Sequence, residues 1–183
     1  MNALHKVISG GQTGVDQAAL RAARDCGLEI GGWCPPGRVS EDGVIPAEFP
    51  LKETPHERSP EAPDVPRSQR TEWNVRDSDG TLVIAPAGEN RQDPGTDWAL
   101  RCARRNARHF LVCDPYDPSA GSKILEWLDA LQISTLNVGG PGEGTSPGIG
   151  ERAYALLLEI FLLREDDDSR QLNSSRGHED STG

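Results

Sequence analysis

Apolar residues in this chain follow two alternating spacings. Short apolar blocks typical of buried strands cover residues 5–9, 28–33, 81–85, 109–113 and 133–138. Apolar residues three and four positions apart, typical of one helix face, occur at 15–26, 96–107, 124–131 and 149–164, and a shorter helix is expected at 71–79. Because strands and helices alternate, the pattern predicts an α/β, Rossmann-like fold: a doubly wound, mainly parallel sheet with helices on both faces.

The length of 183 residues fits a single domain. We expect a ligand-binding domain over residues 1–164, with a proline-rich loop at 53–69. Residues 165–183 are polar and contribute −4 of the formal net charge of −10, through six acidic residues and two arginines. This composition predicts a disordered acidic tail.

Composition excludes several classes of function. Lys and Arg total 19 against 29 Asp and Glu, and they form no basic stripe, so nucleic acid is not an expected partner. No apolar run is long enough to cross a membrane, and the first residues lack a signal-peptide core, which favours the cytoplasm. The four cysteines have neither C-x-x-C nor zinc-site spacing, so we expect reduced thiols and no metal site.

Three glycine-containing loops follow predicted strands, at residues 10–14, 87–96 and 139–145. In open α/β sheets, ligands bind beyond the carboxyl ends of the strands. Glycine lets the backbone approach an anion, and the helix that follows offers free N–H groups. The loops therefore predict that a phosphate is held by backbone amides rather than by many lysines. The spacings match neither the dinucleotide-binding fingerprint nor a Walker A loop.

Several polar residues near these loops have two interpretations. Thr13 and Asp16 have the spacing of a helix capping box, but either can also contact a ligand. Thr96 can cap its helix or donate its hydroxyl to a phosphate. The loop residues Lys52 and Arg70 can pair with an anion or remain solvated surface charges.

Seven ordered blocks carry a family resemblance: residues 8–16 (ISGGQTGVD), 31–35 (GGWCP), 41–43 (EDG), 49–54 (FPLKET), 70–82 (RTEWNVRDSDGTL), 136–141 (LNVGGP) and 147–149 (PGI). With these blocks the chain resembles the molybdenum-cofactor carrier family, within the Rossmann-like, lysine-decarboxylase-like group of nucleotide-ligand-binding proteins. The resemblance implies a cytoplasmic, homo-oligomeric binding protein whose partner is a phosphorylated small molecule. The cargo would be the molybdenum cofactor (molybdopterin) or a related pterin or nucleotide phosphate.

The resemblance also implies which residues contact the ligand. The first loop would bind the anion, Gly95 and Thr96 would form a second phosphate loop, and basic and polar residues near position 70 would line the same cleft. The complete predicted set is Gly10, Gly11, Gln12, Thr13, Gly14, Asp16, Lys52, Arg70, Thr71, Glu72, Gly95, Thr96, Gly139 and Gly140. No catalytic residue and no metal ligand is assigned.

Two alternatives remain open at this point. The first is a phosphoribohydrolase that cleaves nucleoside 5′-monophosphates. In the related enzymes this reaction looks to rest on a Gly-Thr-x-x-Glu segment, whose Glu assists glycosidic cleavage. This chain has Ala99 or Gly148 at the glutamate position, so Glu53, Glu72 or Glu143 would have to supply the carboxylate. The second alternative is a nucleotide-ligand sensor that contacts a protein partner.

Overall fold

The computed structural model describes residues 4–88 and 94–176, and the side chains of residues 4–88 and 94–164. Its centre is a five-stranded sheet in the order β2-β1-β9-β7-β8, in which all neighbouring strands pair in parallel. The strands are β1 (Lys6–Ile8), β2 (Glu29–Gly31), β7 (Gly80–Ile84), β8 (His109–Cys113) and β9 (Thr135–Gly139). The predicted fold class, a single α/β Rossmann-like domain, is confirmed.

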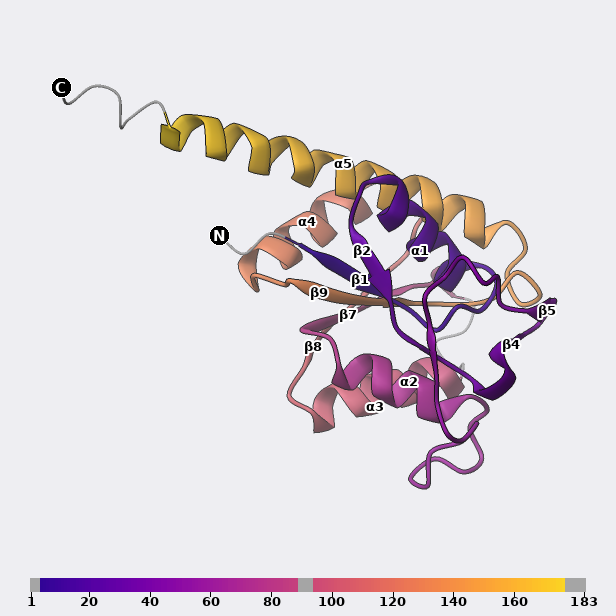
Figure 1. The fold of residues 1–183 in the computed structure, drawn as a ribbon. Helices are drawn as coiled ribbons and strands as arrows, with labels where there is room; N and C mark the ends of the chain where they lie inside the picture. The colour runs from indigo at the N-terminus through magenta and orange to yellow at the C-terminus, as the bar shows by residue number, and fades with distance from the viewer. Residues whose placement is uncertain (1–3, 89–93, 177–183) are drawn as a thin grey trace.

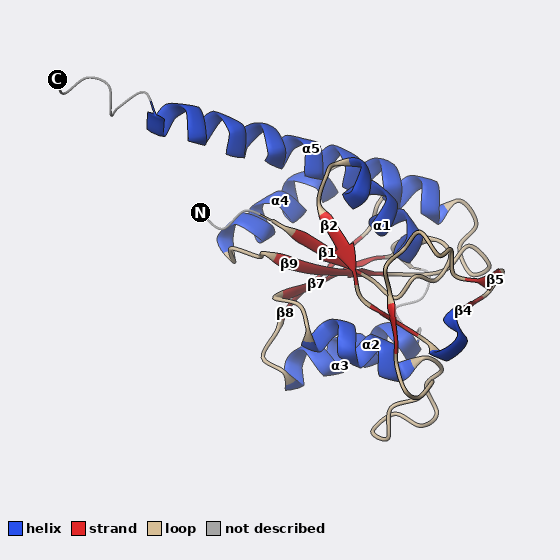
Figure 2. Cartoon of the chain, viewed as in Figure 1, coloured by secondary structure: helices blue, strands red, loops and turns tan. Residues whose placement is uncertain are grey.

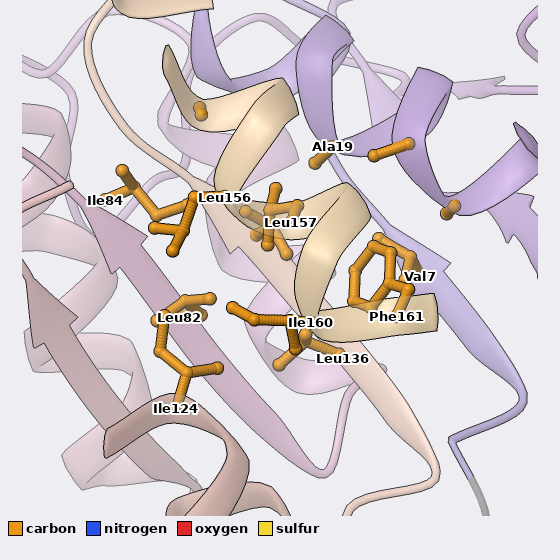
Figure 3. Close-up of a cluster of buried hydrophobic side chains, with 14 of the residues drawn as sticks. Val7, Ala19, Leu82, Ile84, Ile124, Leu136, Leu156, Leu157, Ile160 and Phe161 are labelled. Atoms are coloured by element: carbon orange, nitrogen blue, oxygen red, sulfur yellow. The ribbon is translucent and has the colours of Figure 1, made fainter. Parts of the chain in front are cut away.

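Helices cover both faces of this sheet (Figures 1 and 2). One face carries α1 (Val15–Asp25), α4 (Ala120–Ala130) and α5 (Ile149–Arg176), and the other carries α2 (Ser68–Arg76) and α3 (Pro94–Arg105). The larger core lies under the first layer, where Val7 of the sheet lies beside Phe161 of α5 and Leu136 lies beside Ile160 (Figure 3). The inward face of α1 is largely alanine, which lets α1 and α5 pack closely.

The segment between β2 and α2 is ordered by local pairing. It contains β3 (Trp33–Cys34) parallel to β6 (Lys52–Glu53), the 3₁₀ turn η1 (Pro36–Arg38), and a hairpin of β4 (Val39–Ser40) and β5 (Gly43–Val44). The Arg38 guanidinium donates hydrogen bonds to the carbonyl oxygens of Pro46, Phe49 and Leu51 at 2.9, 2.9 and 3.0 Å. One side chain therefore fixes most of a stretch that composition alone marks as irregular.

The proline-rich loop at 53–69 packs onto the second helical layer. Ala62 and Val65 are buried in a small core with residues of α2 and α3. The Ser68 hydroxyl accepts a hydrogen bond from the Ser59 amide at 2.8 Å and donates one to the Ala62 carbonyl at 2.9 Å. This loop is therefore an ordered part of the domain.

Three elements differ most from expectation. Helix α2 spans Ser68–Arg76 in place of the expected 71–79. The predicted strand at 28–33 divides into β2 and β3 at Gly32, whose φ is +126° and where a Cβ would lie 2.4 Å from the Ser9 carbonyl oxygen. Helix α5 runs to Arg176, so the backbone is helical over residues 165–176, which we expected to be disordered. Extending a packed helix needs no new nucleation, and no Pro or Gly interrupts this stretch. Residues 177–183 lie outside the described part.

A membrane-spanning helix is not found among the described residues, because none of their helices is both long and apolar enough.

Candidate functional site

Of two neighbouring cavities, the smaller lies between the strands β7 and β9 and the helices α2 and α3. The larger opens beyond the carboxyl ends of β1, β7 and β9. Their volumes are about 70 and 260 Å³. Both are lined by Arg70 and Thr71 of α2, by Gly95 and Thr96 of α3, and by Gly140. We treat them as one cleft. It lies where the chain's crossovers diverge to opposite halves of the sheet, the position at which α/β folds bind ligands.

A buried ion pair forms one wall of the cleft. Asp16, in the first turn of α1, is 1% exposed, and its Oδ2 accepts hydrogen bonds from Arg70 Nη1 at 3.1 Å and from the Gln12 amide at 3.3 Å. Burial raises the pKa of the Asp16 carboxyl, and the nearby Arg70 charge opposes that rise. Gly10 makes room for this pair, since a Cβ there would lie 2.1 Å from Arg70 Nη1.

The capping-box interpretation of Thr13 and Asp16 is wrong. The N-cap of α1 is Gly14, which has a φ of 75° and makes no side-chain cap. Thr13 Oγ1 instead accepts a hydrogen bond from the Glu143 amide at 3.3 Å, and the Asp16 carboxylate points to Arg70. Both side chains make tertiary contacts that sequence spacing cannot reveal.

Several backbone amides that we expected to hold a phosphate instead donate hydrogen bonds to oxygen atoms of the protein itself. At the start of α1, the Val15 amide donates to the Pro141 carbonyl at 3.3 Å. At the start of α5, the Glu143 carboxylate accepts hydrogen bonds from the amides of Gly148 and Gly150, both at 2.7 Å. The helix starts that line the cleft, among the described residues, are those of α2 and α3.

The predicted site residues divide into three groups. The residues that line the cleft are Gln12, Asp16, Arg70, Thr71, Gly95, Thr96, Gly139 and Gly140. Gly10, Gly11, Thr13 and Gly14 lie in the adjoining first loop without lining it.

Lys52 and Glu72 form the third group, which the structure places elsewhere. The Lys52 ammonium lies 5.8 Å from the centre of the Trp33 ring, in a separate groove beside β2. The Glu72 carboxylate accepts hydrogen bonds from Arg105 and Ser59 and so holds the proline-rich loop.

Sequence reasoning missed several residues that line the cleft. Arg67 precedes α2 in a left-handed conformation (φ 56°) and lines the larger cavity, as does Glu41 of the β4–β5 hairpin. Asn137 lies within β9, and its Nδ2 donates to Thr81 Oγ1 of β7 at 3.2 Å. The sequence did contain a signal for this pair, since each residue is a polar position inside an otherwise apolar strand. Buried polar groups need partners, so the two positions could have been predicted to contact each other.

The described thiols and carboxylates are not arranged as a metal site. Within the described ranges, His, Cys, Asp and Glu form no group of three or more placed to hold a metal ion. All four cysteines are free thiols, and Cys34 is buried against Leu20 and Phe49. Burial raises the pKa of Cys34 and Cys113, and that of Cys102 to about 12, so these thiols stay protonated at neutral pH.

The glutamates considered for glycosidic cleavage are engaged outside the cleft. Glu53 accepts a hydrogen bond from the Gly37 amide, Glu143 caps α5, and Glu72 holds the proline-rich loop. The carboxylates that line the cleft, within the described part of the chain, are those of Asp16 and Glu41.

Comparison with known proteins gives two matches. The sequence profile of the circularly permutated YpsA SLOG family matches residues 7–161. A crystal structure from Syntrophus aciditrophicus, described as a "Putative molybdenum carrier protein", superimposes with a TM-score of 0.76 and is 36% identical in sequence. The similarity covers 88% of this chain and 96% of that one. No curated protein gives a significant match.

Proposed function

This chain belongs to the circularly permutated YpsA SLOG family, and from that premise we propose that it is a carrier that binds a phosphorylated small molecule in the cleft. The ligand is the molybdenum cofactor or a related pterin or nucleotide phosphate. The name of the Syntrophus protein supports a carrier role, and the cleft supports the phosphorylated ligand. As part of the proposal, the protein acts in the cytoplasm as a homo-oligomer.

The observation that carries this proposal is the pair of arginines in the larger cavity. Arg67 and Arg70 both line it, opposite the third glycine loop. Asp16 holds one end of the Arg70 guanidinium, and Arg70 Nε is buried without a hydrogen-bond partner among the described residues. A guanidinium held in place by a carboxylate suits a phosphate oxygen, since such charge-assisted bonds are the strong ones.

The start of α3 contributes a second source of positive potential. Gly95 and Thr96 lie in its first turn and line both cavities. A helix N-terminus stabilises a nearby anion through its dipole and its amides. The phosphate position we propose therefore lies between α3 and the two arginines, and the first loop shapes this position instead of contacting the anion.

A molybdenum-bearing cargo would be held through its organic part. Metal-binding side chains do not cluster among the described residues, whereas the cleft offers donors for a phosphate and acceptors for a ring. In that arrangement the protein binds the phosphate and the pterin of its cargo.

The direct test is to identify what the protein binds. The purified protein is denatured, the released small molecules are identified by mass spectrometry, and molybdenum is counted by elemental analysis. A pterin phosphate with metal supports the carrier, whereas conversion of a nucleoside monophosphate to free base would assign the enzyme alternative instead. The proposal fails if no phosphorylated compound co-purifies with the protein or protects it from heat.

A pair of arginine variants localises the site. We expect Arg67→Ala to weaken binding of the phosphorylated compound about tenfold, or about 1.4 kcal/mol. Arg58→Ala is the matched control, because Arg58 belongs to the same loop, pairs with Glu57 and does not line the cleft. Equal affinities for the two variants would exclude Arg67 from the site.

A further inference from the structure

The larger cavity has two walls of opposite hydrogen-bonding character. Arg67 and Arg70, on the α2 side, can only donate. Gln12 of the first loop and Glu41 of the β4–β5 hairpin line the same cavity and offer acceptor oxygens. A phosphate would accept hydrogen bonds from the arginine wall and would be repelled by the Glu41 carboxylate. The acceptor wall therefore suits a different part of the ligand, one that donates hydrogen bonds.

Gln12 presents an acceptor that the protein leaves unused. Its side-chain amide is oriented because Nε2 donates to the Val39 carbonyl at 2.9 Å, and its backbone amide donates to Asp16. The residue is 4% exposed, and no donor within the described ranges reaches Oε1. An unpaired buried acceptor is costly, so its persistence indicates a partner that arrives from outside the chain.

Glu41 places a carboxylate at the mouth of the same cavity. Its Oε2 accepts a hydrogen bond from the Gly144 amide at 3.1 Å, which ties the exposed hairpin to the third glycine loop. The carboxylate lies close to Gly142, where a Cβ would be 2.0 Å from Oε1. The glycines of this loop thus make room for a carboxylate, and Oε1 is not used in the bond to Gly144.

We propose, building on the proposed function, that Gln12 and Glu41 recognise a ligand ring whose edge carries adjacent N–H donors. A carboxylate accepts two parallel N–H bonds, and a 2-amino-4-oxo ring presents a ring N–H beside an exocyclic amine. Pterin and guanine share this edge. Adenine presents a donor beside a ring acceptor, which would face the carboxylate unfavourably.

Nucleotides that differ at this edge test the proposal on the purified protein. Binding of 5′-GMP, 5′-IMP, 5′-AMP, 6-hydroxymethylpterin phosphate and inorganic phosphate is measured by calorimetry. IMP lacks the 2-amino group of GMP and is otherwise identical, so GMP is expected to bind at least tenfold more tightly than IMP or AMP. The pterin phosphate distinguishes the two sources of the edge, because it binds more tightly than GMP if the native ring is a pterin and more weakly if it is a guanine.

Two variants assign the effect to a residue. Glu41→Gln is expected to reduce the preference for GMP over IMP to less than threefold and to leave inorganic phosphate bound as well or better. Asp42→Asn removes the same charge from the adjacent hairpin position, which does not line the cavity, and is expected to keep the preference. Far-UV circular dichroism confirms that both variants fold.

The outcomes separate this inference from the proposed function. If phosphate compounds bind but GMP and IMP bind equally, or if Glu41→Gln keeps the preference, the ring-reading role is overturned and the carrier proposal stands. If none of the phosphate compounds binds, the proposed function itself fails.

Discussion

Gly10→Ala is the substitution that most directly tests how the cleft is built. The φ angle at Gly10 is not in the left-handed region, so alanine introduces no backbone strain there. The new methyl group would instead meet the Arg70 guanidinium, with Nη1 at 2.1 Å and Cζ at 2.5 Å. Because this is the flexible end of a side chain, we expect the guanidinium to move away and to release Asp16.

The expected cost follows from that lost contact. Removing one partner of a buried ion pair costs about 3–5 kcal/mol, and a single charged hydrogen bond contributes about 1.5–3 kcal/mol. The Arg70 side chain is 18% exposed and can recover some hydration, so we expect Gly10→Ala to lower the free energy of unfolding by about 2–3 kcal/mol. For a chain of this length that corresponds to a fall in Tm of about 4–12 °C.

Urea unfolding followed by tryptophan fluorescence measures this change. Gly139→Ala is the matched control, since it adds the same methyl group beside the same carboxylate, with Asp16 Oδ1 at an ordinary 3.8 Å. A cost for Gly10→Ala within about 0.5 kcal/mol of the control would contradict the predicted clash.

A double-mutant cycle identifies the cause. In an Arg70→Ala background the obstructing guanidinium is absent, so adding Gly10→Ala is expected to change stability by less than about 0.5 kcal/mol. If Gly10→Ala costs the same in both backgrounds, the ion pair is not what Gly10 protects, and the reasoning fails.

Two further predictions concern pH and the hairpin segment. Because burial raises the pKa of Asp16 above its ordinary value of 3.8, the folded state binds this proton more tightly than the unfolded chain does. Stability should therefore fall as the pH rises from about 4 through the folded-state pKa, and urea titrations at stepped pH should show this fall to be smaller in Asp16→Asn. Arg38→Met removes the donor to the Pro46, Phe49 and Leu51 carbonyls and should lower the free energy of unfolding by about 2–3 kcal/mol. Limited proteolysis should then cleave the variant faster between residues 38 and 51. An unchanged cleavage rate would refute the role of Arg38 in fixing this segment.

Local pattern was sufficient to predict the layers of the fold. The apolar block at 109–113 is the strand β8 with the same bounds, and the helical spacing from Val15 matches α1 to within a residue. Strands and helices of this kind can be predicted because burial acts on neighbouring positions of one segment. The same signal underestimated α5, because a polar helix has no apolar periodicity beyond the last packed turn.

The sequence also indicated which end of the sheet holds the cleft, since glycine loops after strands predict that edge. It did not indicate which groups would face the cavity. Arg70 was predicted to pair with an anion, whereas Asp16 was expected to cap a helix or contact a ligand. Its spacing gave no sign of an ion pair with a residue 54 positions away in the chain. Lys52 was predicted from its charge and lies in a different groove.

Tertiary structure alone decided how the loops share their polar groups. Glu41 accepts a hydrogen bond from an amide of the third loop, and Glu143 accepts one from an amide of α5, although the sequence predicted that such amides bind a phosphate. Gln12 Oε1 has no hydrogen-bond partner among the described residues. These outcomes depend on competition between acceptors that only folding brings within bonding distance. Hydrophobic periodicity depends on which side of each segment packs against the core. The hydrogen-bond partner of a polar group depends instead on which loop the tertiary structure places beside it.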